Sequence, residues 1–439
     1  MGISMFVIFL GYLFIGVVML FTADIGTEHG LSFAVYLRAP FGIYGTHLPS
    51  ISRGIVAAIW FGIQTYLGAL ALNGISQYLF SFDNWFVWYL IFAAVQVFNT
   101  ALGIRAVEKF ADYAAPILIA ISIWMYYFLD DLATTNGHNI WSFIGQENTP
   151  LFLIFIANFS LWSALAVDIP NITRYLKVEA GTKSFFRRNK NVFVAQLVAL
   201  PLVSMFMAFI GAIAFVATGD WNPITIIQDT ETGITSIVLL ALILLAQWST
   251  NNAANLIPAA LSFVNAAPKY INYKWGVVIA GIVGTIAMPW LILNNLFTFL
   301  GYYGGALSAV AGIMVCDYYF IRRRRLNVPD LFRTKGQYTY AGGFNYAGLI
   351  SWIIAGSLAI WQLQQAYLVG FPVGFILYYI LMKAWILPQY AQAEIKSGYA
   401  SDYLATSVGK EWAYSNDHFT REDIFTTSSK VHSDITLNN

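Results

Sequence analysis

Uncharged polar side chains are concentrated in one short part of an apolar stretch, between residues 247 and 255. Six of these nine residues are polar, in the sequence Gln-Trp-Ser-Thr-Asn-Asn-Ala-Ala-Asn. Ser, Thr and Asn in an apolar helix commonly bridge it to a neighbouring helix. Six such residues together favour a second interpretation, in which the stretch forms a site for a polar solute or an ion.

The first part of this stretch carries oxygen atoms that suit a cation. Ser249 and Thr250 follow Ala246 by about one turn, so in a helix they share its face. Hydroxyl and carbonyl oxygens are ligands for hard cations, here Na⁺. Asn255 lies further round the same helix, where its amide can hydrogen-bond a neutral polar solute.

A second candidate pair is Trp60 and Gln64, which are four residues apart and therefore share a helix face. A planar heterocycle can stack on the Trp ring while the Gln amide offers it both a donor and an acceptor. The alternative is a Trp that packs in the core and a Gln that bonds to a neighbouring helix. The pair alone does not decide between the two.

A third group of polar residues occupies 158–163, in the sequence Asn-Phe-Ser-Leu-Trp-Ser, and Pro170 follows it. This pattern indicates a helix that is interrupted or ends early, and transporters place substrate and ion sites at such breaks. Trp162 is then a candidate for a second stacking wall. The alternative is a Trp that faces lipid or packs between helices.

The elements that carry these residues are predicted to be membrane helices. Of the 439 residues, 58% are apolar and 10% charged, against roughly 25% charged in an average soluble protein. A transmembrane helix needs about 20 mainly apolar residues. The eleven predicted spans are 3–23, 52–79, 84–104, 111–129, 151–168, 192–218, 233–267, 275–296, 297–321, 345–366 and 368–388. We predict an all-α polytopic membrane domain over 1–390 and a polar, largely disordered cytoplasmic tail over 391–439.

The basic residues predict the orientation of these spans. All 23 Lys and Arg fall in alternate loops or at and beyond the end of the last span. The opposite loops, such as 130–150 and 219–232, contain Asp and Glu but no Lys or Arg. The positive-inside rule then places the basic loops and the C-terminus in the cytoplasm, with the chain in the cell membrane. Eleven spans put Met1 outside, so either the protein is unusual in this respect or a preceding helix is missing from the sequence.

The composition also excludes several classes of function. The 23 basic and 22 acidic residues leave no net charge to attract nucleic acid, and the single cysteine, Cys316, cannot form a disulfide within the chain. The spans are almost free of charge, and all five His lie in loops or the tail. No catalytic group or metal cluster is evident, so we predict no enzyme and no cofactor, and a neutral substrate.

Together these motifs resemble the nucleobase–cation symporter-1 family, which includes the bacterial hydantoin transporter and allantoin, uracil and cytosine permeases. The allantoin and uracil branch is the most similar. The matching segments form one collinear series. They are His29–Leu31, Leu37–Ala39, Phe41–Gly45, Arg53, Trp60–Thr65, Asp168–Asn171 to Arg174–Tyr175, Ser249–Asn255, Pro268–Asn272, and Asp317–Tyr319 with Arg322.

The resemblance implies a pair of inverted five-helix repeats plus two further helices, the architecture of the neurotransmitter:sodium symporters. It implies that Trp60 and Trp162 are aromatic walls around the substrate ring, and that Gln64 and Asn255 hydrogen-bond its amide edges. Half of a sodium site would come from the Ala246 and Ser249 carbonyls with the Thr250 hydroxyl. Transport would proceed by alternating access, coupled to Na⁺ or H⁺.

One departure accompanies the resemblance. The first predicted span corresponds to the second helix of the family, so the family's first helix, with the other half of the cation site, is expected to be absent. We therefore expect an N-terminally truncated twelve-helix transporter. The predicted function is secondary import of a nucleobase or related neutral heterocycle or ureide. The alternatives are a non-transporting membrane receptor or scaffold and, third, a membrane enzyme that turns over its ligand.

Overall fold

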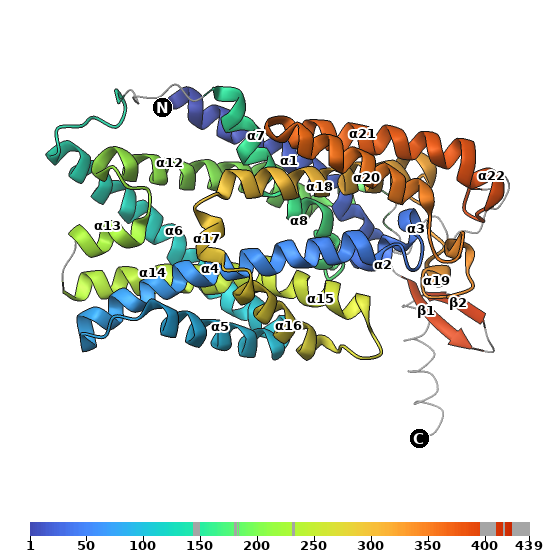
Figure 1. The fold of residues 1–439 in the computed structure, drawn as a ribbon, viewed down its shortest axis with the longest axis horizontal. Helices are drawn as coiled ribbons and strands as arrows, with labels where there is room; N and C mark the ends of the chain where they lie inside the picture. The colour runs from blue at the N-terminus through green and yellow to red at the C-terminus, as the bar shows by residue number, and fades with distance from the viewer. Residues whose placement is uncertain are drawn as a thin grey trace, which may run out of the picture. The chain divides into compact units, whose positions relative to one another are not determined.

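The computed structural model describes residues 1–143, 150–179, 182, 184–230, 233–395, 410–415 and 418–423. In these ranges the chain is mainly helical, with one short antiparallel hairpin formed by β1 (Lys410–Ser415) and β2 (His418–Asp423) (Figure 1). The chain divides into two compact units, each assembled from three separate stretches of sequence. Unit 1 comprises 1–14, 49–164 and 199–303, and unit 2 comprises 15–48, 165–198 and 304–439.

Unit 1 contains the predicted site residues. Its helices and helical segments are the first part of α1 (Gly2–His29), α4 (His47–Phe80), α5 (Trp85–Ala101), α6 (Ile104–Thr135), α7 (Leu151–Leu161), α12 (Leu200–Thr218), α13 (Pro223–Thr230), α14 (Ile234–Asn251), η2 (Asn252–Leu256), α15 (Ile257–Ala266), α16 (Tyr273–Ile286) and α17 (Pro289–Leu293). The helix α16 lies beside both α15 and α5 (Figure 1).

Unit 2 contains the remaining helices and the hairpin. They are α2 (Phe33–Tyr36), α3 (Arg38–Phe41), α9 (Pro170–Thr173), α10 (Phe185–Arg188), α11 (Lys190–Phe193), η1 (Val194–Ala199), most of α18 (Leu296–Val315), η3 (Cys316–Ile321), α19 (Val328–Leu331), η4 (Gln337–Thr339), α20 (Tyr346–Trp361), η5 (Leu363–Gln365), α21 (Ala366–Leu381), η6 (Met382–Ile386) and α22 (Leu387–Gln389). The short helix α8 (Ser163–Asp168) contributes residues to both units.

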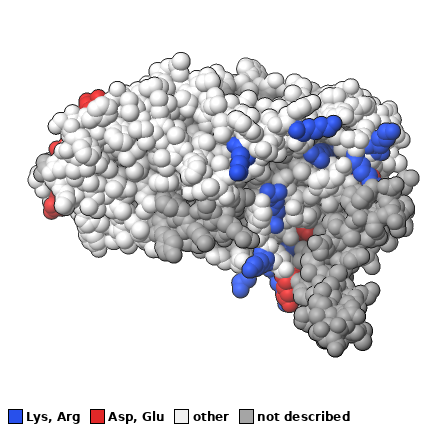
Figure 2. Space-filling model, turned by 90° about the horizontal axis from the view of Figure 1, so that it is seen from below, with Lys and Arg blue, Asp and Glu red and all other residues white. Residues whose placement is uncertain are grey.

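Among the described residues, eight helical stretches are long and apolar enough to cross a membrane. Three shorter apolar helices, α5, α16 and α20, lie where the sequence predicts further spans. Most of the surface on the face drawn in Figure 2 carries no charged side chain. Large apolar side chains such as Phe98, Phe297 and Trp361 are exposed, as expected of helices that face lipid.

Several helices begin at an asparagine whose side chain accepts a hydrogen bond from a free backbone N–H. Asn84 accepts from the Val87 nitrogen at 3.2 Å and starts α5. Asn272 accepts from the Trp275 nitrogen at 3.0 Å and starts α16. Asparagine is among the preferred residues at this position because it satisfies one of the unpaired N–H groups of the first turn.

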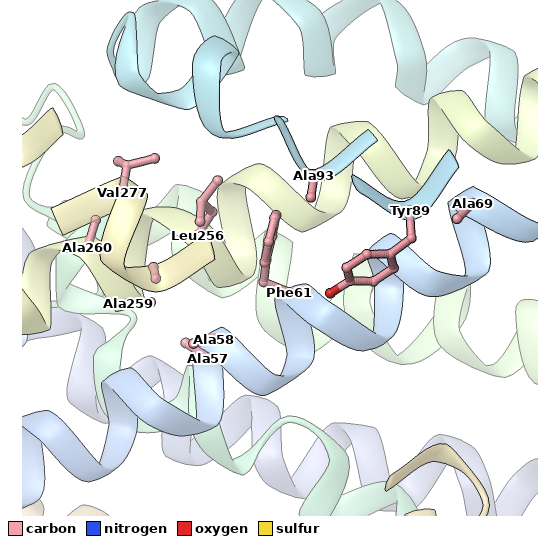
Figure 3. Packing of buried hydrophobic residues seen from close by; sticks show 11 residues of the cluster. Ala57, Ala58, Phe61, Ala69, Tyr89, Ala93, Leu256, Ala259, Ala260 and Val277 are labelled. Atoms are coloured by element: carbon pink, nitrogen blue, oxygen red, sulfur yellow. The ribbon is translucent and has the colours of Figure 1, made fainter. Parts of the chain in front are cut away.

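Small residues allow the helices of unit 1 to pack closely. In Figure 3, Phe61 lies between Leu256 and Tyr89, with Ala69 beside Tyr89 and the alanines of α15 near Val277. A Cβ atom on Gly62 would overlap the Gly284 carbonyl oxygen, and one on Gly284 would overlap the Ala58 carbonyl oxygen. The backbones of α4 and α16 are therefore in direct contact, as small residues permit between membrane helices.

Two predicted spans are interrupted. The span 151–168 ends its first helix at Leu161, and Trp162 adopts φ −96° and ψ 9° before α8 begins. The predicted span 275–296 is not one helix, because α16 ends at Ile286 and Met288 adopts a left-handed φ of 50°. Pro289 follows at the first turn of α17, where its missing N–H is tolerated.

Two buried arginines of unit 2 are paired with buried carboxylates. The Arg322 side chain is fully buried, and its Nε atom lies 2.8 Å from Asp317 Oδ2. Its guanidinium also contacts the buried Glu394 carboxylate. A second buried arginine, Arg188, lies with its Nε 2.6 Å from Asp24 Oδ1. Each of these charges is satisfied by hydrogen bonds, without which a buried ion is costly.

Tyrosines complete the network around Arg322. Burial raises the pKa of Tyr340 to about 12, so its hydroxyl keeps its proton. That hydroxyl donates to the Ala39 carbonyl oxygen at 2.7 Å and accepts from the Arg322 guanidinium at 3.1 Å. The Tyr338 hydroxyl donates to Glu394 Oε1 at 2.7 Å.

The predicted tail 391–439 lies mostly outside the described residues, and its disorder stays a prediction there. The described residues at its start behave differently. Gln392 and Glu394 are buried, because Glu394 pairs with Arg322 and Gln392 accepts a hydrogen bond from the same guanidinium at 2.5 Å.

Candidate substrate and cation site

Trp60 and the break at Trp162 are linked through Tyr303. The Trp60 ring lies on α4 and contacts the Tyr303 ring edge-to-face, with centroids 6.4 Å apart. The Tyr303 hydroxyl donates a hydrogen bond to the Leu161 carbonyl oxygen at 2.9 Å. Leu161 is the last residue of α7, and carbonyls at a helix end lack an intrahelical partner. Both tryptophans are half-buried, so their rings remain available for stacking.

Gln64 lies one turn further along α4 and reaches the polar stretch on α14. The Thr250 hydroxyl is 2.9 Å from the Ala246 carbonyl oxygen and 3.4 Å from Gln64 Oε1. The structure thus places a predicted substrate residue, Gln64, next to a predicted cation residue, Thr250. Ser249 is buried beside them, whereas the Thr250 side chain is exposed.

Asn255 lies in η2, a π-helical segment inside the predicted seventh span. Its Nδ2 donates to Asn251 Oδ1 at 3.0 Å, four residues earlier. Short π-helical segments inside α-helices are rare overall, and those that occur are often at functional sites. The predicted cation residues lie before this segment, on α14, and Asn255 lies within it.

A buried arginine is held by the carbonyls that these irregularities leave available. Arg53 is 1% exposed, and its Nε donates to the Ala164 carbonyl oxygen at 2.9 Å. A second guanidinium nitrogen lies 3.4 Å from the Ala254 carbonyl oxygen, within η2. Arg53 therefore connects the interrupted α7–α8 stretch to the π-helical segment.

Sequence reasoning assigned no role to two residues of this arrangement, Gln96 and Tyr303. Gln96 lies fully buried on α5 and hydrogen-bonds Thr65 and Asn251. A glutamine in a largely apolar 17-residue helix was the available signal. Tyr303 sits in a glycine-rich stretch, and nothing in its spacing indicated that it would join Trp60 to Leu161.

The long apolar helices and the exposed apolar surface define a multi-pass membrane protein, and the candidate site residues lie on or next to interrupted helices. Comparison with known proteins identifies its family. Residues 1–385 match the family described as permeases for cytosine/purines, uracil, thiamine and allantoin. The chain belongs to this family, nucleobase–cation symporter-1, and it is a transporter rather than an enzyme.

Curated relatives agree with the family. The hydantoin permease of Microbacterium maritypicum is 33% identical over 401 residues, which covers 88% of this chain and 80% of the permease. The allantoin permease of Bacillus subtilis is 27% identical over 401 residues and is covered to 79%.

A solved structure has the same fold. Mhp1, a nucleobase-cation-symport-1 family transporter in a closed conformation with bromovinylhydantoin bound, superposes with a TM-score of 0.81 at 30% identity. The match covers 92% of this chain and 88% of that chain. The inward-facing conformation of Mhp1 matches with a TM-score of 0.80. The predicted family and the cation-coupled transport class are confirmed.

Proposed function

We propose that this chain imports a planar, uncharged heterocycle or ureide with an amide edge, of the hydantoin, allantoin, uracil and cytosine class. Trp60 and Trp162 stack on its faces, and Gln64 and Asn255 hydrogen-bond its edges. The half-buried rings of Trp60 and Trp162 support stacking, and Tyr303 contacts the Trp60 ring and the backbone next to Trp162. The permeases for hydantoin and allantoin among its relatives support the substrate class.

The coupling cation in this proposal is Na⁺, with H⁺ as the alternative. The Ala246 and Ser249 carbonyls and the Thr250 hydroxyl supply half of its site. One observation carries the proposal: the Thr250 hydroxyl lies within reach of both the Ala246 carbonyl and the Gln64 amide. A cation that draws this hydroxyl toward itself changes the hydrogen bonding of a substrate residue, which couples the two binding events.

The proposed topology follows from the charges and the family. By the positive-inside rule, we place the Lys- and Arg-bearing loops and the C-terminus on the cytoplasmic side of the cell membrane. Eleven crossings and an inverted-repeat core accompany this topology, and transport proceeds by alternating access.

Uptake into proteoliposomes tests the function. Labelled hydantoin, allantoin, uracil and cytosine are offered with and without an inward Na⁺ gradient, and at least one is expected to accumulate in a gradient-dependent way. Trp60→Ala and Asn255→Ala should lose most of this uptake. The matched control Trp361→Ala removes an exposed ring of unit 2 and should keep it.

The outcomes separate the alternatives. Uptake that survives both site substitutions would show that the site lies elsewhere. Binding of a heterocycle without flux would favour a receptor. Accumulation driven by a pH gradient alone would replace Na⁺ by H⁺.

A further inference from the structure

A chain of buried side-chain amides leads from α5 to Asn255. Gln96, Asn251 and Thr65 are fully buried and Asn255 nearly so. Asn251 Nδ2 lies 2.9 Å from Gln96 Oε1, and Asn255 Nδ2 lies 3.0 Å from Asn251 Oδ1. Asn255 therefore donates to Asn251, and Asn251 donates to Gln96, so all three amides are oriented in the same direction.

The orientation of these amides is set by neighbouring oxygen atoms that can only accept hydrogen bonds. The Thr65 hydroxyl donates its single proton to the Phe61 carbonyl oxygen at 2.7 Å, so toward other partners Thr65 Oγ1 is an acceptor. Asn251 Nδ2 faces this oxygen at 3.2 Å and the Phe61 carbonyl oxygen at 3.0 Å. Turning the Asn251 amide over would set its oxygen against two acceptors.

Gln96 is oriented in the same way. Its Nε2 lies 3.0 Å from Thr65 Oγ1 and 3.4 Å from the Phe92 carbonyl oxygen, both acceptors. Its Oε1 must then point to Asn251, where it receives the 2.9 Å hydrogen bond. A reversed Gln96 would again oppose oxygen to oxygen, and buried polar groups without partners are rare.

The consequence falls on Asn255. Its Nδ2 has one proton committed to Asn251 Oδ1. Its Oδ1 takes part in no hydrogen bond with the residues that the structure describes. Asn255 is thus left with one acceptor oxygen and one N–H, held in a single orientation.

We propose that Gln96 and Asn251 are positioning residues that fix the amide of Asn255, so that its oxygen reads an N–H group of the transported heterocycle. The inference rests on the proposed function, in which Asn255 contacts the substrate. It adds a requirement: the substrate edge at Asn255 must offer a ring N–H donor, and methylation of that nitrogen is rejected. A site built to hydrogen-bond a substrate N–H discriminates strongly against the analogue that lacks it.

Binding of methylated probes tests this requirement. The full chain in detergent is titrated with hydantoin, 1-methylhydantoin and 3-methylhydantoin, and with uracil and its two N-methyl isomers, following intrinsic tryptophan fluorescence. For the parent compound that binds, one methyl isomer should bind at least about tenfold more weakly. The ratio of the two dissociation constants is the readout, because a purely structural loss would weaken both compounds alike.

Three variants locate the cause. Asn251→Leu removes the acceptor that holds Asn255 and should bring the ratio to within about threefold of one, because a free amide can present either group. Gln96→Met removes one of three acceptors around Asn251 and should give an intermediate ratio. The matched control Asn252→Leu changes the next residue, which is equally buried and donates to Asn99 instead, and should keep the wild-type ratio.

Each result decides. A wild-type ratio retained in Asn251→Leu and Gln96→Met, or a ratio lost equally in Asn252→Leu, overturns the inference and leaves the proposed function intact. If Asn251→Leu does not fold, the Gln96→Met ratio decides alone. If no parent compound binds the wild-type chain, the proposed function fails and this inference with it.

Discussion

The Tyr303 hydroxyl donates to the Leu161 carbonyl oxygen at 2.9 Å, one residue before the Trp162 break. The same tyrosine ring contacts Trp60. A single side chain therefore contacts one predicted aromatic wall, Trp60, and the backbone of the residue that precedes the other, Trp162.

Tyr303→Phe keeps the ring and removes this hydrogen bond. We expect a loss of about 1 kcal/mol in the free energy of unfolding, typical of one hydrogen bond, and a several-fold higher KM for substrate uptake. Thermal unfolding in detergent and uptake kinetics measure the two effects. Tyr302→Phe, at the exposed neighbouring tyrosine, is the control, and an equal effect there would contradict the assigned role.

Thr250→Val tests the cation half-site while preserving shape. The hydroxyl that contacts Ala246 and Gln64 is lost, so the Na⁺ concentration for half-maximal uptake should rise about tenfold or more, with protein stability nearly unchanged. Thr285→Val is the matched control, since Thr285 makes the same hydrogen bond to a carbonyl four residues earlier at 2.9 Å. Unaltered Na⁺ dependence in Thr250→Val would remove this hydroxyl from the cation site.

Gly62→Ala tests the close contact of α4 and α16. The added methyl group would overlap the Gly284 carbonyl, and overpacking typically costs about 1–3 kcal/mol. A lower unfolding temperature in detergent is the expected result. Gly211→Ala is the control, because a Cβ there meets nothing within 4 Å and alanine in a helix interior stabilises by roughly 0.5–1 kcal/mol. Equal shifts for both variants would contradict the packing argument.

Arg322→Met tests the buried charges of unit 2. Removing the arginine leaves the Asp317 and Glu394 carboxylates without their cation, and breaking a buried pair costs about 3–5 kcal/mol. We expect loss of folded protein on expression or a large fall in unfolding temperature. Arg333→Met removes a half-exposed partner of Asp330 and should change stability by less than about 1 kcal/mol. A stable Arg322→Met protein would show that the network is dispensable.

Much of the fold follows from hydropathy alone. Apolar length predicted where nearly every long helix lies, and the polar residues 247–255 marked the segment that carries the candidate site. The family was also identifiable, because its motifs occur in one collinear series. These features are local in sequence, so the sequence expresses them directly.

The features that sequence reasoning missed depend on contacts between distant segments. Gln96 is informative only once α5 is packed beside Asn251, and Glu394 becomes part of the fold because Arg322 lies buried next to it. The left-handed turn at Met288 also has no signature beyond the proline that follows. Such residues look ordinary along the chain, and their roles arise from tertiary structure.

The π-helical segment η2 changes the turn per residue inside one continuous helical stretch. Each residue of an α-helix turns the chain by about 100°, so residues five apart, such as Thr250 and Asn255, would normally point well away from each other. Asn251 and Asn255 are four apart and share a face even in a regular α-helix, whereas the wider π-helical turn lessens the angle between Asn255 and Thr250. Deleting one residue here would change the angle between Thr250 and Asn255, so the number of residues between 250 and 255 is part of the geometry of the candidate site.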